Sequence, residues 1–339
     1  MSTDLSSHPY ASFLHEVEKP ARYLGGEYNQ IAKDPASVRA SLCLAFPDLY
    51  DIGMSHLGTK ILYSLVNERD DMLCERAFAP WPDMEKALRE RGLPVLSLEN
   101  RRPLSEFDAV GFSLQYELTF TNLLNLLDLS CIPLRSADRG DADPIVLAGG
   151  PVATQPEPVA PFVDVFLLGD AEEKLPELLL EIAACRDEGV GRAQTLIRLA
   201  KLGGLYVPSL YDTTVDLQSG FEVVSGPKVE GIPERPQRVI LEDINRFPFP
   251  DDSPVAAAEA IFDRLSVEIA RGCTEGCRFC QAGMIYRPVR ERDPEQIVDT
   301  VMKAIEKGGY DEAGLTTLST ADYSCISPLM SKLMKKLKE

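Results

Sequence analysis

The stretch Leu265-Ser-Val-Glu-Ile-Ala-Arg-Gly-Cys-Thr-Glu-Gly-Cys-Arg-Phe-Cys280 places three cysteines directly after an apolar run. The spacing is C-x3-C-x2-C, at Cys273, Cys277 and Cys280. The apolar run over 265–270 predicts a β-strand, and Gly272 and Gly276 give the loop the backbone freedom that wrapping around a metal requires. Three close thiolates can bind three irons of a [4Fe–4S] cluster and leave the fourth iron open to a small molecule.

Zinc is the alternative occupant of these cysteines. A closed structural zinc site needs four Cys or His ligands, and the three histidines, His8, His15 and His56, lie far upstream. The other cysteines lie in or beside apolar stretches, and we interpret them as small buried hydrophobic residues: Cys43, Cys74, Cys131, Cys185 and Cys325. Ordinary cysteine usage and the lack of a basic-then-apolar N-terminus predict a cytoplasmic protein without disulfides.

The cysteine motif resembles that of radical S-adenosylmethionine (SAM) enzymes, C-x3-C-x-aromatic-C. In that superfamily SAM binds the open iron, and the reduced cluster cleaves it to methionine and a 5′-deoxyadenosyl radical that abstracts hydrogen from a substrate. The resemblance implies that Cys273, Cys277 and Cys280 are the iron ligands and that Phe279 packs near the adenine. It also implies an electron donor such as flavodoxin or ferredoxin. The cofactor carries the hard chemistry in such enzymes, while the protein supplies orientation and shielding.

Length and charge narrow the remaining possibilities. A chain of 339 residues suggests about two domains. Its 35 basic and 53 acidic residues give a net charge of −18, which argues against general nucleic-acid binding. We expect no membrane association, because no apolar run approaches the roughly 20 residues that span a bilayer. Two local basic groups remain. Arg287, Arg290 and Arg292 are candidates for SAM or substrate contact, and the lysines over 332–338 are interpreted as the solvated face of a terminal helix.

The N-terminal half alternates between strand-like and helix-like segments. Strands are predicted over 40–46, 94–98, 108–114, 144–149 and 163–168, and helices over 58–68, 119–129 and 172–185. Because strands alternate with helices and each strand ends in glycine or a polar residue, we expect an α/β fold with a parallel, Rossmann-like sheet. Ligands of such sheets bind beyond the carboxyl ends of the strands.

This pattern resembles the cobalamin-binding-type domain that precedes many radical SAM barrels. The resemblance places ligand-facing loops at Ser113, at Gly149, Gly150 and Thr154, and at Gly169, so cobalamin is a candidate cofactor. The D-x-H-x-x-G motif of cobalamin domains with a histidine ligand is absent: Asp51-Ile-Gly-Met-Ser-His56-Leu-Gly58 has a different spacing. We therefore interpret His56 as a helix-start or loop residue rather than an axial ligand. A Rossmann-like domain without cobalamin is the alternative.

The C-terminal half is predicted to begin a (β/α)6 barrel. The ranges we assign are an N-terminal extension (1–36), the cobalamin-type domain (37–190), a linker with a small hairpin from 205–211 and 221–224 (191–257), and the radical SAM part (258–339). In that part, Asp293 caps a helix to about residue 307, a strand covers 313–318, and a last helix starts near Pro328. In relatives the loop after this second strand contacts SAM, and here it offers Ser319, Thr320 and Asp322.

Radical SAM barrels usually have six βα units, and this chain contains two. We therefore expect a second polypeptide to complete the barrel, or poor activity of the chain alone. The segment Pro20-Ala-Arg-Tyr-Leu-Gly-Gly-Glu27 and the Asp48–Gly58 loop resemble one bacterial subfamily of radical SAM proteins with a cobalamin-type domain.

The first hypothesis on function is a radical SAM enzyme of unknown substrate, with methyl transfer if cobalamin binds. The alternative is a non-catalytic iron–sulfur or zinc module for sensing or assembly. A methylthiotransferase is disfavoured, because that class needs three further clustered cysteines in its N-terminal domain.

Overall fold

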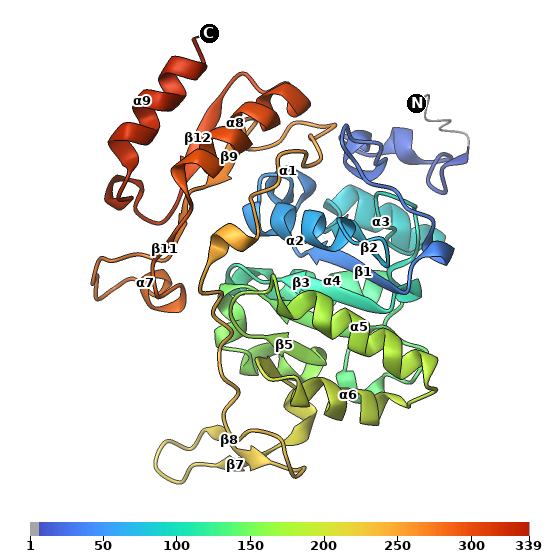
Figure 1. The fold of residues 1–339 in the computed structure, drawn as a ribbon. Helices are drawn as coiled ribbons and strands as arrows, with labels where there is room; N and C mark the ends of the chain where they lie inside the picture. Colours follow the sequence, from blue (N-terminus) through green and yellow to red (C-terminus); the bar gives the residue numbers. More distant parts are fainter. Residues whose placement is uncertain (1–6, 339) are drawn as a thin grey trace.

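The computed structural model describes residues 7–338, which form two α/β parts joined by a long crossing segment (Figure 1). The first part is built on one six-stranded sheet with the order β2-β1-β3-β4-β5-β6. Its strands are β1 (Ala40–Phe46), β2 (Met72–Phe78), β3 (Ala109–Ser113), β4 (Ile145–Gly149), β5 (Val165–Leu167) and β6 (Leu205–Tyr206). The first five are parallel and β6 runs antiparallel to β5. The predicted α/β class with a mainly parallel sheet is therefore confirmed.

Helices cover this sheet, and one large hydrophobic core lies beneath them. They are α1 (Tyr50–Gly53), α2 (Leu57–Asn67), α3 (Pro82–Arg91), α4 (Phe120–Leu129), α5 (Lys174–Asp187) and α6 (Arg192–Lys201). Every residue of β1 is buried, as its unbroken apolar run predicts. The strand order reverses between β1 and β3, and in open parallel sheets ligands bind at such a switch point.

Strand β2 of this sheet was not predicted from the sequence. The expected strand over 94–98 is wrong: this segment makes only an isolated bridge, between Leu96 and Pro103. The N–H of Leu98 donates to the carbonyl of Arg76 in β2, but the N–H of Ser97 donates to the carbonyl of Arg102, so no ladder with β2 forms. The sheet edge is β2, whose Glu75 and Arg76 interrupt its apolar pattern. Both charged residues are nevertheless buried.

The connection between the two parts also differs from expectation. The hairpin predicted from 205–211 and 221–224 is wrong, because the start of its first segment is β6, which pairs with β5 in the main sheet. The hairpin consists of β7 (Tyr211–Val215) and β8 (Glu222–Pro227), which project from the first part (Figure 1). The proline-rich segment after it then crosses to the second part.

The second part begins with two parallel βα units. Strand β9 (Leu265–Glu268) pairs in parallel with β12 (Ala313–Thr316), and helix α8 (Pro294–Gly308) connects them. A short bridge of β10 (Ala270–Arg271) with β11 (Arg290–Glu291) encloses α7 (Ala282–Ile285), and α9 (Ile326–Lys336) ends the described chain. Lysines of α9 reach acidic side chains of α8, which fits the predicted solvated face.

The two parts share hydrophobic packing. Ile61 of α2 and Phe249 of the crossing segment lie in one buried cluster with residues of β9 and α8. A smaller cluster packs Ala256 and Ala258 against Phe46 and Tyr50 of the first part. Over residues 7–338, no helix combines the length and apolar character that crossing a bilayer requires.

Candidate functional site

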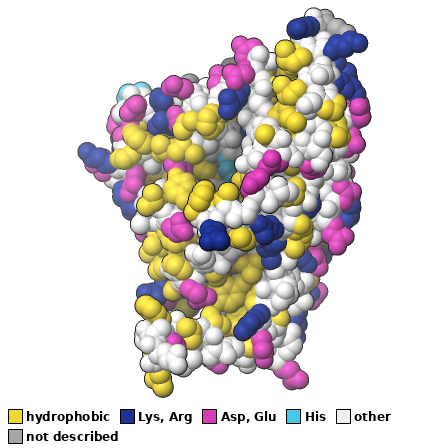
Figure 2. All heavy atoms as spheres, turned by 90° about the vertical axis from the view of Figure 1, so that its left-hand side faces the viewer, with side chains coloured by type: hydrophobic (Ala, Val, Ile, Leu, Met, Phe, Trp, Pro, Cys, Tyr) yellow, Lys and Arg dark blue, Asp and Glu magenta, His cyan; other side chains and the backbone are white. Residues whose placement is uncertain are grey.

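A cavity of about 360 Å³ lies where the carboxyl ends of the two sheets meet. The first part contributes the residues after β3, β4 and β5 and the start of α2, and the second part contributes the residues after β9 and β12. Figure 2 views the molecule from the side of the 272–289 loop, and hydrophobic side chains border the hollow in this face. The cavity therefore occupies the position where parallel sheets bind ligands.

A narrower apolar pocket of about 70 Å³ adjoins this cavity and lies between the sheet and α5. Ser113, Gly150 and Gly169 line both spaces. Gly150 has a φ of 94°, and a Cβ there would lie 2.6 Å from the carbonyl oxygen of Leu114, so this edge accepts no side chain.

The predicted cobalamin-type loops are only partly brought together. Ser113, Gly150 and Gly169 line the cavity, and Gly149 lines the apolar pocket. Thr154 is exposed at the end of a 3₁₀ turn, Pro151–Thr154, and its hydroxyl donates to the carbonyl of Pro151 at 2.7 Å. It lines neither space.

His56 is the N-cap of α2, as the sequence suggested, and its ring lines the cavity. Its Nδ1 accepts a hydrogen bond from the backbone N–H of Thr59 at 3.1 Å. Because Nδ1 uses its lone pair as an acceptor, the neutral ring carries its proton on Nε2. Burial lowers the pKa of His56 to about 4, partly offset by a hydrogen bond with Gln115. The neutral ring is therefore held by Thr59 and Gln115 at the wall of the cavity.

The three motif cysteines lie on the loop over 272–289, which the β10–β11 bridge closes at its base. Cys277 is exposed, while Cys273 and Cys280 are half-buried. The sulfur of Cys280 accepts from the N–H of Gly283 at 3.4 Å, and the other two sulfurs bond to no described residue. Among residues 7–338, no three Cys, His, Asp or Glu side chains already converge as a metal site.

The other residues assigned to SAM by resemblance lie outside the cavity lining. Phe279 is 92% exposed. Thr316, Thr317 and Leu318 line the cavity at the end of β12, and the next residues do not line it. Ser319 precedes a 3₁₀ turn that contains Thr320 and Asp322, and Asp322 is exposed.

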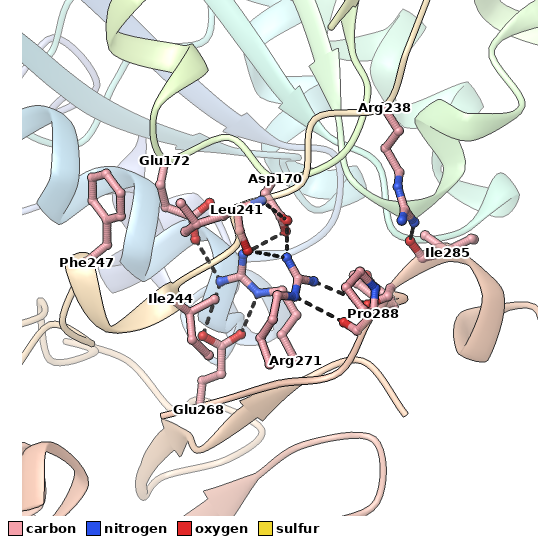
Figure 3. Close-up of polar contacts among 12 residues, drawn as sticks. Asp170, Glu172, Arg238, Leu241, Ile244, Phe247, Glu268, Arg271, Ile285 and Pro288 are labelled. Carbon is pink, nitrogen blue, oxygen red and sulfur yellow. Dashed lines mark hydrogen bonds and ion pairs between the residues drawn. The ribbon is translucent and has the colours of Figure 1, made fainter. Parts of the chain in front are cut away.

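Sequence reasoning missed a network of ion pairs beside the cavity, which Figure 3 shows. Arg271, just before the cysteine loop, donates to Asp170 at 2.8 Å, to Glu172 at 2.7 Å and to Glu268 at 3.0 Å. Arg290 also pairs with Asp170, and Arg292 pairs with Glu268 at 2.7 Å. Three carboxylates thus balance three guanidinium groups.

Burial and charge act in opposite directions on the carboxyl groups of this network. Burial raises the pKa of Asp170 and of Glu268, but the charge of Arg271 and hydrogen bonds to the carboxylates outweigh it and hold both pKa values below their usual range. Conversely, although burial disfavours the charged form of Arg271, Glu268 and Glu172 raise its pKa. All three groups therefore remain ionised near neutral pH.

The arginines expected near SAM or substrate are placed differently from one another. Arg290 and Arg292 are buried in the network and line no part of the cavity, while Arg287 is exposed. The one sequence signal for the network was the charge pattern around the apolar strand, with Glu268 and Arg271 flanking its end.

The remaining cysteines mostly follow the prediction. Cys43, Cys74 and Cys185 are buried and Cys325 is half-buried. Cys131 is exposed, which corrects the prediction: it follows α4 in a turn with a φ of 56°, at the surface. All eight cysteines are free thiols.

Comparison with known proteins identifies both parts of the chain. Residues 58–208 match the family described as radical SAM proteins, N-terminal, and residues 267–338 match the radical SAM superfamily. An uncharacterized protein of Methanocaldococcus jannaschii is 23% identical over 294 residues, which are 86% of this chain and 52% of that protein.

A solved structure shares the fold. The radical SAM methyltransferase TsrM from Kitasatospora setae, with cobalamin and a [4Fe–4S] cluster bound, matches with a TM-score of 0.51 and 13% identity. The match covers 88% of this chain and 51% of TsrM. The chain thus spans about half the length of both proteins.

Proposed function

We propose that this chain, whose residues 58–208 and 267–338 match radical SAM family models, holds the cofactors of a radical SAM enzyme. In this proposal the loop binds a [4Fe–4S] cluster through Cys273, Cys277 and Cys280, and the cavity receives SAM. The observation that carries it is the cavity itself, which joins the stem of the cysteine loop to the carboxyl ends of both sheets.

The donor set fits such a cluster. Three thiols occur on one loop, and those of Cys273 and Cys277 bond to no other described residue, so metal binding would break no existing interaction of theirs. The N–H of Gly283 already donates to the sulfur of Cys280. The chemistry that a bound, reduced cluster supplies is one-electron cleavage of SAM to methionine and a 5′-deoxyadenosyl radical, which takes hydrogen from a substrate.

In this proposal, residues of the chain itself orient SAM and shield it from water. Glu268, Gly272 and Thr316 line the second part's side of the cavity, where polar groups can hold the amino acid end of SAM. Leu57, Ile61 and Leu318 line it with apolar surface, which limits the access of water. An electron donor such as flavodoxin or ferredoxin, and a substrate recognised by further barrel elements, complete the proposed system.

Methyl transfer with cobalamin is a second candidate function. It is favoured by the apolar pocket that adjoins the cavity at Gly150 and Gly169, because a large planar cofactor needs an edge without side chains and a cleft for its tail. When bound, cobalamin supplies a carrier for a methyl group. In this arrangement His56 serves as a hydrogen-bond donor and not as a cobalt ligand, because its Nε2 carries the proton.

The test is anaerobic reconstitution with iron and sulfide, followed by dithionite and SAM, with 5′-deoxyadenosine as the readout. Cys277→Ala is compared with Cys131→Ala, which removes an exposed thiol outside the loop. We expect wild type and Cys131→Ala to bind about four irons and form deoxyadenosine, and Cys277→Ala to lose the product.

Other outcomes separate the alternatives. A four-iron cluster without product would keep the family assignment and indicate that further barrel elements are needed for SAM cleavage. Zinc at the loop, with no iron cluster, would contradict the proposal and favour a structural or sensing module.

A further inference from the structure

The two stems of the cysteine loop are cross-strand partners. In the β10–β11 bridge, Arg271 lies opposite Arg290, and the 18 residues between them include all three motif cysteines. The backbone of the bridge therefore fixes the stems only to each other. The side chains of both stems, in contrast, reach the first part of the molecule.

Both stem arginines reach the same carboxylate. Asp170, just after β5, accepts from the guanidinium of Arg271 through Oδ1 at 2.8 Å and from that of Arg290 through Oδ2. The backbone N–H of Leu241 in the crossing segment donates to Oδ2 at 2.8 Å. Figure 3 shows dashed lines from the Asp170 carboxylate to its partners. One side chain thus joins three segments that are distant in sequence.

The carboxylate is well shielded from water. The side chains of Asp170, Arg271 and Arg290 are 11%, 12% and 7% exposed. Charge-assisted hydrogen bonds in such surroundings are stronger than neutral ones, and each oxygen of the Asp170 carboxylate accepts from a different guanidinium group. Removing the negative charge would leave two guanidinium groups close together with only part of their compensation.

We propose that Asp170 is a positioning residue, which sets the cysteine loop over the cavity by holding both of its stems. This inference rests on the proposed function of the loop. It assigns to the first part a role beyond ligand binding: the carboxyl end of β5 fixes where the cluster stands relative to SAM. Since Asp170 contacts the stem arginines and not the cysteines, its loss is expected to loosen the loop without removing an iron ligand.

The same strand provides a matched control. Asp164 directly precedes β5, is buried, and also bridges two arginines, Arg139 at 3.0 Å and Arg192 at 2.5 Å. It also accepts from the N–H of Val146, at 2.7 Å, as Asp170 does from that of Leu241. Asp164→Asn therefore makes the same chemical change at the opposite end of β5, away from the cavity.

The experiment compares Asp170→Asn, Asp164→Asn and wild type after cluster reconstitution. We measure the rate at which a chelator removes iron, the KM for SAM and kcat for deoxyadenosine formation, and the electron paramagnetic resonance signal of the reduced cluster with SAM. For Asp170→Asn we expect iron removal and the KM to rise about tenfold or more, a smaller change in kcat, and an altered signal. For Asp164→Asn we expect all three readouts to stay near wild type.

Failure of the positioning role of Asp170 can be distinguished from failure of the proposed function. If wild type forms the cluster and Asp170→Asn matches it in chelation, KM and signal, or if Asp164→Asn shows the same changes, the positioning role is wrong and the proposed function stands. If wild type forms no cluster, the proposed function itself fails. Should Asp170→Asn not fold, Arg290→Gln removes one of the two arms, and a wild-type chelation rate in that variant would overturn the inference.

Discussion

His56 illustrates how one hydrogen bond decides what a residue can do. A histidine beside a candidate cofactor cavity invites assignment as a metal ligand, but the Nδ1 atom caps α2 and the proton is thereby placed on Nε2. The environment also keeps the ring neutral, because burial lowers its pKa to about 4. The ring therefore lines the cavity without carrying charge.

We predict that His56→Asn removes part of the acid sensitivity of the protein. The unfolded ring titrates near 6.5 and the folded one near 4, so between these values the unfolded state binds more protons and the wild-type free energy of unfolding falls as the pH drops. Asparagine can keep the cap but does not titrate.

The measurement is urea unfolding of wild type and His56→Asn at pH 7.5 and pH 5. We expect the difference in stability between them to shift in favour of the variant at pH 5. An unchanged difference would show that His56 titrates normally in the folded protein.

At the scale of single elements, α8 is the clearest case of local sequence deciding structure. The Asp293 carboxylate accepts from the N–H groups of Glu295 and Gln296, at 2.8 and 3.2 Å, and Pro294 occupies the first helical position. Gly309 ends the helix with a φ of 70°. Both ends were readable because caps depend on residues only a few positions apart.

We predict that Asp293→Ala lowers the free energy of unfolding by about 0.5–2 kcal/mol, because it leaves the first amide groups of α8 without their acceptor. Hydrogen exchange should rise at the amides of Glu295 and Gln296. Glu306→Ala, which changes an exposed carboxylate on the same helix, is the control and should leave these amides protected. Equal exchange in both variants would contradict the capping role.

Strand β2 shows the opposite case. Glu75 and Arg76 break its apolar pattern, and their burial is compensated only by distant residues: Arg76 pairs with Glu99 at 2.6 Å and with Glu27 at 3.2 Å, and Glu75 accepts from Ser97 at 2.5 Å. No local pattern encodes such partners, so the sequence favoured the neighbouring apolar segment over 94–98 instead.

At the scale of the whole molecule, the crossing segment ties the two parts together. Phe249 is 4% exposed and shares a core with Ile61 of the first part and Val267 of the second. Arg238, from the same segment, donates to the backbone carbonyls of Ile285 and Arg287 in the cysteine loop. The crossing segment therefore packs against both parts and holds them together.

We predict that Phe249→Ala lowers the free energy of unfolding by about 3–5 kcal/mol, the usual cost of removing a buried phenylalanine. Chelator access to the loop should increase, since the second part loses support. Phe221→Ala is the control, because Phe221 is 72% exposed on the β7–β8 hairpin, and its effect should stay within about 0.5 kcal/mol. A Phe249→Ala protein as stable as the control would show that the parts are held independently.

The sequence by itself determined the features that depend on local pattern. The apolar runs of β1, β3, β4 and β9, the caps of α2 and α8, and the α/β class follow from residues close together in the chain, and the cysteine spacing pointed to the superfamily. These are readable because periodicity and capping act over a few residues.

Only the tertiary structure decided which distant charges meet. The burial of β2, the joining of β6 to the main sheet, and the convergence of Arg271 and Arg290 on Asp170 each require residues that are far apart in sequence to become neighbours. An isolated buried charge is costly, so its position is stable only once its partner is in place. That condition is satisfied by the folded chain and leaves no local trace in the sequence.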